Sequence, residues 1–162
     1  LKNYGRQVLD GHRLTFLYNL GVTHLVTNNH KMAYKHFNRI MNLGRLAMRT
    51  DLQGVARLLR LLLLSQNKDN VEINHFLRNS KRFFGSKDRN YKIEVIVHRW
   101  LKKHNGIVGT TERKESLKSF SKLLEPLMAQ DRLGAEEMFI WASAKQRGIK
   151  PIMVSQERLE SQ

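Results

Sequence analysis

The chain has 162 residues, a length typical of one domain, and its 41% hydrophobic and 27% charged residues indicate a globular protein rather than a disordered one. Lysine and arginine number 29 against 14 acidic residues, and the net charge of +15 predicts a polyanionic partner, nucleic acid before an anionic membrane surface. The absence of cysteine excludes disulfides and thiolate metal sites. No apolar run reaches the roughly 18 residues of a membrane span.

The opening of the chain predicts a helical hairpin. Residues 1–12 are polar and interrupted by Gly5 and Gly11, which indicates a short lead-in helix or a loose end, and the start at Leu1 rather than Met indicates a processed form or a segment of a longer protein. A first helix follows from Arg13, a break at residues 27–30, and a second helix over 31–44. One face of each helix carries apolar or small residues: Leu14, Leu17, Tyr18, Gly21 and Leu25 on the first, and Ala33, Phe37, Ile40 and Gly44 on the second.

The next helix, over residues 51–64, is apolar around most of its circumference. Thr50 or Asp51 is a suitable N-cap, and only Arg57 and Arg60 interrupt the apolar residues. A helix of this kind is enclosed by its neighbours, so we expect it to be the central one.

The second half of the chain predicts further helices joined by short polar loops. Residues 71–84 form one helix. Residues 91–104 contain β-branched residues that suit a strand, but Ile93, Ile96, Val97, Trp100 and Leu101 fall on one helical stripe and no other segment reads as a strand partner, so we expect a second helix there. Residues 112–124 form an amphipathic helix with inward residues that include Leu123, and Pro126 ends it, kinks it or opens a new one. The last helix runs from about Asp131, a possible cap, to about Arg147. Gly148 stops it, Pro151 follows at the distance expected after a helix end, and the tail after Val154 is expected to fray.

The fold class expected is therefore all-α, a single domain of six or seven helices arranged as stacked hairpins. Residues 13–85 form the first helical units, 91–150 the later units and 151–162 the tail. The helical hairpins recur at roughly 35–40 residues, the range of helical solenoids.

Two stretches resemble a known family. Ala33, Phe37, Ile40 and Gly44 resemble the second helix of a pentatricopeptide or tetratricopeptide repeat, and residues 148–151, after 135–139, resemble the end of a pentatricopeptide repeat. The resemblance implies a helical-repeat RNA-binding protein, often organellar, whose first helices read single-stranded bases. It places the base-contacting positions on Phe16 and Asn19. The alternative, which we favour for these two residues, is a core Phe16 and a solvated Asn19.

Clusters of basic residues support nucleic-acid binding independently of the resemblance. The candidate nucleic-acid-binding cations are Arg78, Lys81, Arg82, Lys87, Arg89, Lys92, Arg99, Lys102 and Lys103. Phe83, Phe84 and Tyr91 lie between them, and cations beside aromatic rings suit a single strand, because phosphates bind the cations and bases stack on the rings. The alternative is that the cations form ordinary solvated faces and the aromatic residues belong to the core.

Catalytic patterns are weak in this sequence. His24, His30 and His36 are six residues apart and do not share a helical face, and no HExxH arrangement, phosphate-binding glycine loop or GxSxG elbow occurs. A metal-dependent nuclease needs convergent carboxylates, whereas the acidic residues here are scattered along the chain. We therefore expect no enzyme activity, no metal site and no cofactor.

Three hypotheses follow from these patterns. The first is a single-stranded RNA-binding helical-repeat domain in organellar RNA processing or translation, in the mitochondrial matrix or the nucleus. The second is a protein-interaction module of the tetratricopeptide kind that binds an acidic partner. The third is a helical accessory domain of a larger nucleic-acid machine, such as a polymerase or viral replication protein, that binds through charge alone.

Overall fold

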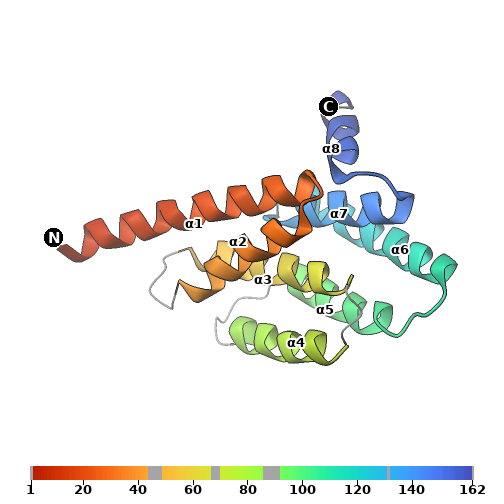
Figure 1. Cartoon of the computed structure of the whole chain (residues 1–162), viewed down its shortest axis with the longest axis horizontal. Helices are drawn as coiled ribbons and strands as arrows, with labels where there is room; N and C mark the ends of the chain where they lie inside the picture. The colour runs from red at the N-terminus through yellow and green to blue at the C-terminus, as the bar shows by residue number, and fades with distance from the viewer. Residues whose placement is uncertain (1, 44–48, 67–69, 86–91, 131, 162) are drawn as a thin grey trace.

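The chain folds into helices throughout the part described by the structure, a computed structural model in which residues 2–43, 49–66, 70–85, 92–130 and 132–161 are described. No strand occurs in these ranges, which confirms the predicted all-α class. The described residues form eight helices rather than the six or seven expected (Figure 1). They are α1 (Lys2–Val26), α2 (His30–Asn42), α3 (Thr50–Leu64), α4 (Asn70–Gly85), α5 (Lys92–His104), α6 (Thr110–Met128), α7 (Ala135–Arg147) and α8 (Pro151–Glu160).

The first helix is longer than predicted, because Gly5 and Gly11 lie inside it. A glycine in a helix interior costs about 1 kcal/mol relative to alanine but keeps its backbone hydrogen bonds, so it does not have to end the helix. The separate lead-in segment expected over residues 1–12 is therefore wrong. From Lys2 onward these residues belong to α1, whose N-terminal end projects beyond the other helices (Figure 1).

The predicted turn between the first two helices is confirmed. Asn28 adopts a positive φ of 63°, and the Asn29 side chain caps α2 by accepting a hydrogen bond from the Met32 amide at 3.3 Å. Asparagine tolerates the left-handed region and is a favoured N-cap, so the two asparagines reverse the chain within a few residues.

The α1–α2 hairpin packs through the residues that the sequence indicated. Ala33, Phe37 and Ile40 are fully buried, whereas Gly44 lies outside the described residues. A Cβ atom built on Gly21 would come within 2.5 Å of the Phe37 ring. The absence of a side chain at Gly21 is therefore what allows the two helices to approach so closely.

Helix α3 is the central helix, as predicted, and contacts α1, α2, α4, α5 and α7. Leucine, valine and alanine residues are buried around its whole circumference. The predicted N-cap is wrong, because Thr50 and Asp51 both lie within the helix and Arg49 precedes it. Instead of capping the helix, the Asp51 carboxylate accepts a hydrogen bond from Arg49 at 2.9 Å.

An aromatic cluster joins α5, α6 and α7. The ambiguous segment is helical, as predicted, and its Trp100 stacks on Phe120 at a centroid distance of 4.3 Å and meets the edge of Trp141 at 6.2 Å. Leu123 was expected to face inward but is 51% exposed, because its neighbour Leu124 takes the buried position. The proline at position 126 lies in the last turn of α6, which ends two residues later.

The C-terminal region contains the helix that the sequence analysis missed. The expected cap Asp131 lies outside the described residues, and α7 begins at Ala135, later than predicted. Gly148 ends α7 with a φ of 70°, as expected, and three residues later Pro151 opens α8 at the first helical position, which proline favours. The frayed tail predicted after Val154 is wrong, because Val154 is buried against α7 and Arg147 pairs with Glu157.

None of the described helices is both long and apolar enough to cross a membrane.

Candidate polyanion-binding surface

The predicted basic residues of α4 and α5 that the structure describes all lie on the surface. Those exposed are Arg78, Lys81 and Arg82 on α4, and Lys92, Arg99, Lys102 and Lys103 on α5. Lys87 and Arg89, in the segment that connects the two helices, lie outside the described residues. We call the seven described cations the basic face.

A groove of about 300 Å³ brings part of the basic face together. Lys81 lines it from α4, and Arg99 and Lys102 line it from successive turns of α5. The other four cations of the basic face do not line this groove. The structure therefore assembles three of the predicted residues into one concave site and leaves the rest on the surrounding surface.

The floor of this groove is held by a buried histidine. Nε2 of His98 lies 2.9 Å from the Ser80 hydroxyl, which ties α5 to α4. Burial, with the nearby charges of Lys81 and Lys102, lowers the pKa of His98 to about 4, so the imidazole is neutral at neutral pH. His98 therefore adds no positive charge to the three cations that line the groove.

One carboxylate also lines the groove. Glu94 lies beside Nδ1 of His98, one helical turn away on α5. Burial raises the pKa of Glu94, while the charge of Lys81 acts in the opposite direction. Lys81, Arg99 and Lys102 still outnumber this acid, so the groove carries a net positive charge at neutral pH.

The aromatic residues of this region do not form the platform that the sequence suggested. Phe84 is buried in the core, and the Phe83 ring is covered by the guanidinium of Arg57 at 3.8 Å. Tyr91 lies outside the described residues. The prediction that interleaved aromatics offer stacking surfaces on the basic face is therefore wrong for Phe83 and Phe84, because both rings already have partners within the fold.

The two positions suggested by the helical-repeat resemblance lie on α1, away from the groove. Phe16 is 63% exposed and Asn19 is exposed. The core assignment that we favoured for Phe16 is therefore wrong, whereas Asn19 is solvated as expected. Phe16 is the kind of ring that a base can stack on, but neither residue lines the groove.

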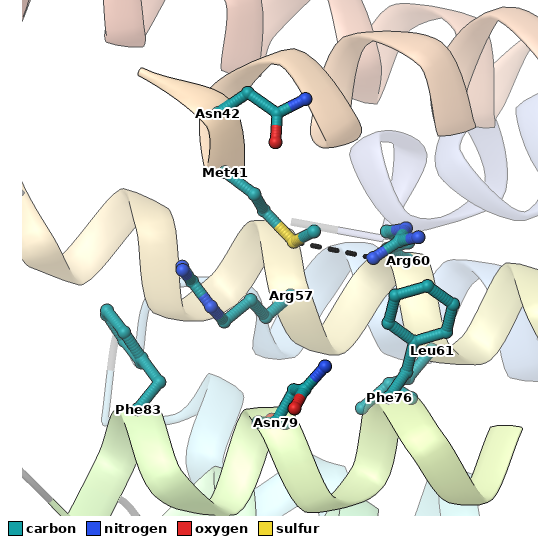
Figure 2. Close-up of a pocket in the computed structure, with 9 residues that line it drawn as sticks. Met41, Asn42, Arg57, Arg60, Leu61, Phe76, Asn79 and Phe83 are labelled. Atoms are coloured by element: carbon teal, nitrogen blue, oxygen red, sulfur yellow. Dashed lines mark hydrogen bonds between the residues drawn. The ribbon is translucent and has the colours of Figure 1, made fainter. Parts of the chain in front are cut away.

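A second site, which the sequence analysis did not identify, lies between the C-terminal end of α2, α3 and α4. We call it the arginine pocket; its volume is about 220 Å³. Figure 2 shows Arg57 and Arg60 rising from α3 toward side chains of the two neighbouring helices. The lining residues are Met41, Asn42, Arg57, Arg60, Leu61, Phe76, Asn79, Ser80 and Phe83.

Both guanidinium groups of the arginine pocket are held by aromatic rings. Arg60 lies 3.6 Å from the centre of the Phe76 ring, and its Nη2 donates a hydrogen bond to the Tyr34 hydroxyl at 2.7 Å. Arg57 lies over Phe83 and donates from Nη1 to the Gln53 carbonyl at 3.1 Å. Guanidinium groups favour such stacking, which fixes their planes while leaving N–H groups at the edges.

The described lining of the arginine pocket carries two positive charges and no acidic side chain. Within the described part of the chain, no carboxylate forms a salt bridge with Arg57 or Arg60. Arg60 is only 5% exposed, and its Nε has no hydrogen-bond partner. Burial and the charge of Arg60 lower the pKa of Arg57 to about 10, so the Arg57 guanidinium is still charged at neutral pH.

The histidines that the sequence analysis considered do not gather into a metal site. His24 and His36 stack face to face at 5.3 Å between α1 and α2. Among the residues that the structure describes, no three His, Cys, Asp or Glu side chains are placed to hold a metal ion.

No protein-family model, curated protein or solved structure matches this chain.

Proposed function

We propose that this domain binds single-stranded RNA through the basic face of α4 and α5. The observation that carries the proposal is the groove in which Lys81, Arg99 and Lys102 converge from two helices. The chain as a whole carries a net charge of +15, so the groove lies in a strongly positive field. Such a surface attracts a polyanion and releases its counterions on binding.

The contacts available on the basic face favour phosphate over base recognition. Lys81 and Lys102 are flexible cations that suit backbone phosphates, whereas Phe83 and Phe84 are engaged within the fold. Binding through phosphates carries little sequence information. We therefore propose weak sequence preference, with exposed Phe16 and Asn19 on α1 as a separate contact if the hairpins stack as helical repeats do.

The same observation favours a second candidate function. A domain that binds through charge alone suits a helical accessory part of a larger nucleic-acid machine, which holds template or product without reading it. Equal affinity for single strands of different sequence, and for duplex, supports this second function. A clear preference for single strands supports the first.

The test is a fluorescence-anisotropy titration of the full chain with mixed-sequence single-stranded RNA at several salt concentrations. The affinity is expected to fall steeply with salt, because each neutralised phosphate contributes a slope of about −0.7 in log K against log salt. The triple variant Arg78→Glu, Lys81→Glu, Arg82→Glu is expected to bind at least about tenfold more weakly, since six units of charge change at the site.

A matched variant separates the basic face from net charge. Lys114, Lys118 and Lys122 are exposed on α6 and line no part of the groove. Their reversal to glutamate changes the net charge by the same amount and is expected to weaken binding far less. Equal losses in the two triple variants would show that only net charge matters, and unchanged affinity of the α4 variant would exclude the basic face.

A further inference from the structure

We propose that the arginine pocket binds a phosphate monoester, the group carried by a nucleotide or by the 5′ end of a phosphorylated strand. This site is separate from the α4–α5 groove and does not depend on RNA binding there. The two sites share none of the lining residues that the structure describes. Ser80 lines the pocket, and its hydroxyl is 2.9 Å from His98, which lines the groove.

Arg60 carries a buried positive charge that no described acidic side chain compensates. An arginine guanidinium stays protonated in proteins, and a buried charge is costly unless an opposite charge and hydrogen bonds satisfy it. Arg60 is 95% buried, its Nε lacks a hydrogen-bond partner, and no described carboxylate pairs with it. A bound anion supplies the opposite charge that Arg60 lacks.

The guanidinium groups of Arg57 and Arg60 are held in place before any ligand binds. Phe76 and Phe83 hold the two guanidinium planes, and the Tyr34 hydroxyl fixes one nitrogen of Arg60. Arg57 and Arg60 are three residues apart on α3 and therefore project from the same side of the helix. A ligand finds donors that are already positioned, so little conformational freedom is lost on binding.

The arginine pocket collects several hydrogen-bond donors within a small volume. A carboxylate is satisfied by one guanidinium in a bidentate pair, whereas a phosphate presents three strong acceptor oxygens and can engage two. Asn42 and Asn79 add side-chain amides to the lining. The volume of about 220 Å³ is below the roughly 300–1,000 Å³ of pockets for drug-sized ligands, which suits one phosphate group rather than a whole nucleotide.

The test follows the arginine side chains of the full chain by NMR, with ¹⁵N-labelled arginine and inorganic phosphate as the probe. The Nε–H signals of Arg57 and Arg60, assigned by Arg57→Lys and Arg60→Lys, are expected to shift and saturate. The signal of Arg113, which donates to the Ile107 carbonyl outside the pocket, is expected to stay in place. Unmoved signals of both pocket arginines in the wild-type chain would overturn the proposal.

Thermal unfolding gives a second measurement, at ionic strength matched with chloride. A phosphate concentration about 100 times the Kd is expected to raise the Tm by about 5–10 °C. Phosphate also stabilises proteins by exclusion from their surface, so the comparison is with Arg57→Gln, which is expected to lose the saturable part of the rise. The control Lys118→Gln, at an exposed position on α6, is expected to keep it. Equal rises in wild type and Arg57→Gln would contradict the proposal.

The source of the phosphate is distinguished by three further probes: adenosine 5′-monophosphate and a short RNA with either a 5′-phosphate or a 5′-hydroxyl. Shifts with the mononucleotide indicate a nucleotide site, and shifts only with the phosphorylated RNA indicate a strand-end site. The basic-face variant Arg78→Glu, Lys81→Glu, Arg82→Glu is expected to keep saturable binding of inorganic phosphate and the shifts of the Arg57 and Arg60 signals. Failure of the groove and failure of the pocket are therefore observed separately.

Discussion

The close approach of α1 and α2 predicts that glycine-to-alanine substitution is less favourable at Gly21 than at Gly11 of the same helix. Alanine in place of glycine in a helix interior gains about 1 kcal/mol from backbone propensity. At Gly11 a Cβ atom meets nothing within 4 Å, so Gly11→Ala is expected to stabilise the domain by about this amount. At Gly21 the Cβ atom would lie 2.5 Å, 2.9 Å and 3.0 Å from three atoms of the fully buried Phe37 ring.

The ring of Phe37 cannot move aside without displacing the core around it, so Gly21→Ala adds an overpacking cost of about 1–3 kcal/mol. The propensity gain is common to both variants and cancels in their difference. Chemical denaturation of the two variants is therefore expected to place Gly21→Ala about 1–3 kcal/mol below Gly11→Ala, which is about 2–12 °C in Tm for a domain of this size. If Gly21→Ala proves as stable as Gly11→Ala, the hairpin does not pack through Gly21 as described.

Two further predictions concern stability. Burial lowers the pKa of His98 and of His104 from 6.5 to about 4, so the unfolded state binds more protons and stability is expected to fall as the pH decreases from 6.5 toward 4. Denaturation at a series of pH values measures this fall in stability. The double variant His98→Gln, His104→Gln is expected to show a flatter dependence of stability on pH. Gly148 has a φ of 70° and an open surrounding, so Gly148→Ala is expected to cost about 1–2 kcal/mol and Gly148→Asn less. Gly134 has a φ of 85°, and a Cβ atom there would meet Val55. Gly134→Asn is therefore expected to lower the Tm as much as Gly134→Ala does in thermal melts.

Local patterns in the sequence predicted most of the helices. The stripe that contains Phe37 and Ile40 and the apolar circumference of α3 are strong signals, because burial requires them whatever the partner is. Residues 92–104 show the same rule: Val97, Trp100 and Leu101 are buried on one helical face, so the period decided the element against β propensity. Pro151 was misleading, because a proline that follows one helix is also favoured at the start of the next.

Local sequence patterns could not predict contacts between distant parts of the chain. The Tyr18 hydroxyl donates to Glu137 at 2.7 Å, which joins α1 to α7, whereas units of a linear solenoid contact only their neighbours. The roles of Phe83 and Phe84 were equally hidden, because a ring beside cations in sequence is available for stacking only if the fold leaves it uncovered. The sequence indicated a basic face, but only the structure shows which cations meet in a groove.

The sequence pattern did not identify Arg57 and Arg60 as candidate binding residues. On an otherwise apolar helix, Arg57 and Arg60 read as interruptions, and an apolar side chain of similar volume is often neutral or stabilising in place of a buried charge. Here the structure places both charges against rings and leaves Nε of Arg60 without a partner. A charge that folding alone would not favour is stabilised once an anion binds beside it. A buried arginine with one unpartnered N–H on the central helix is therefore a stronger indication of a ligand than the more numerous cations on the surface.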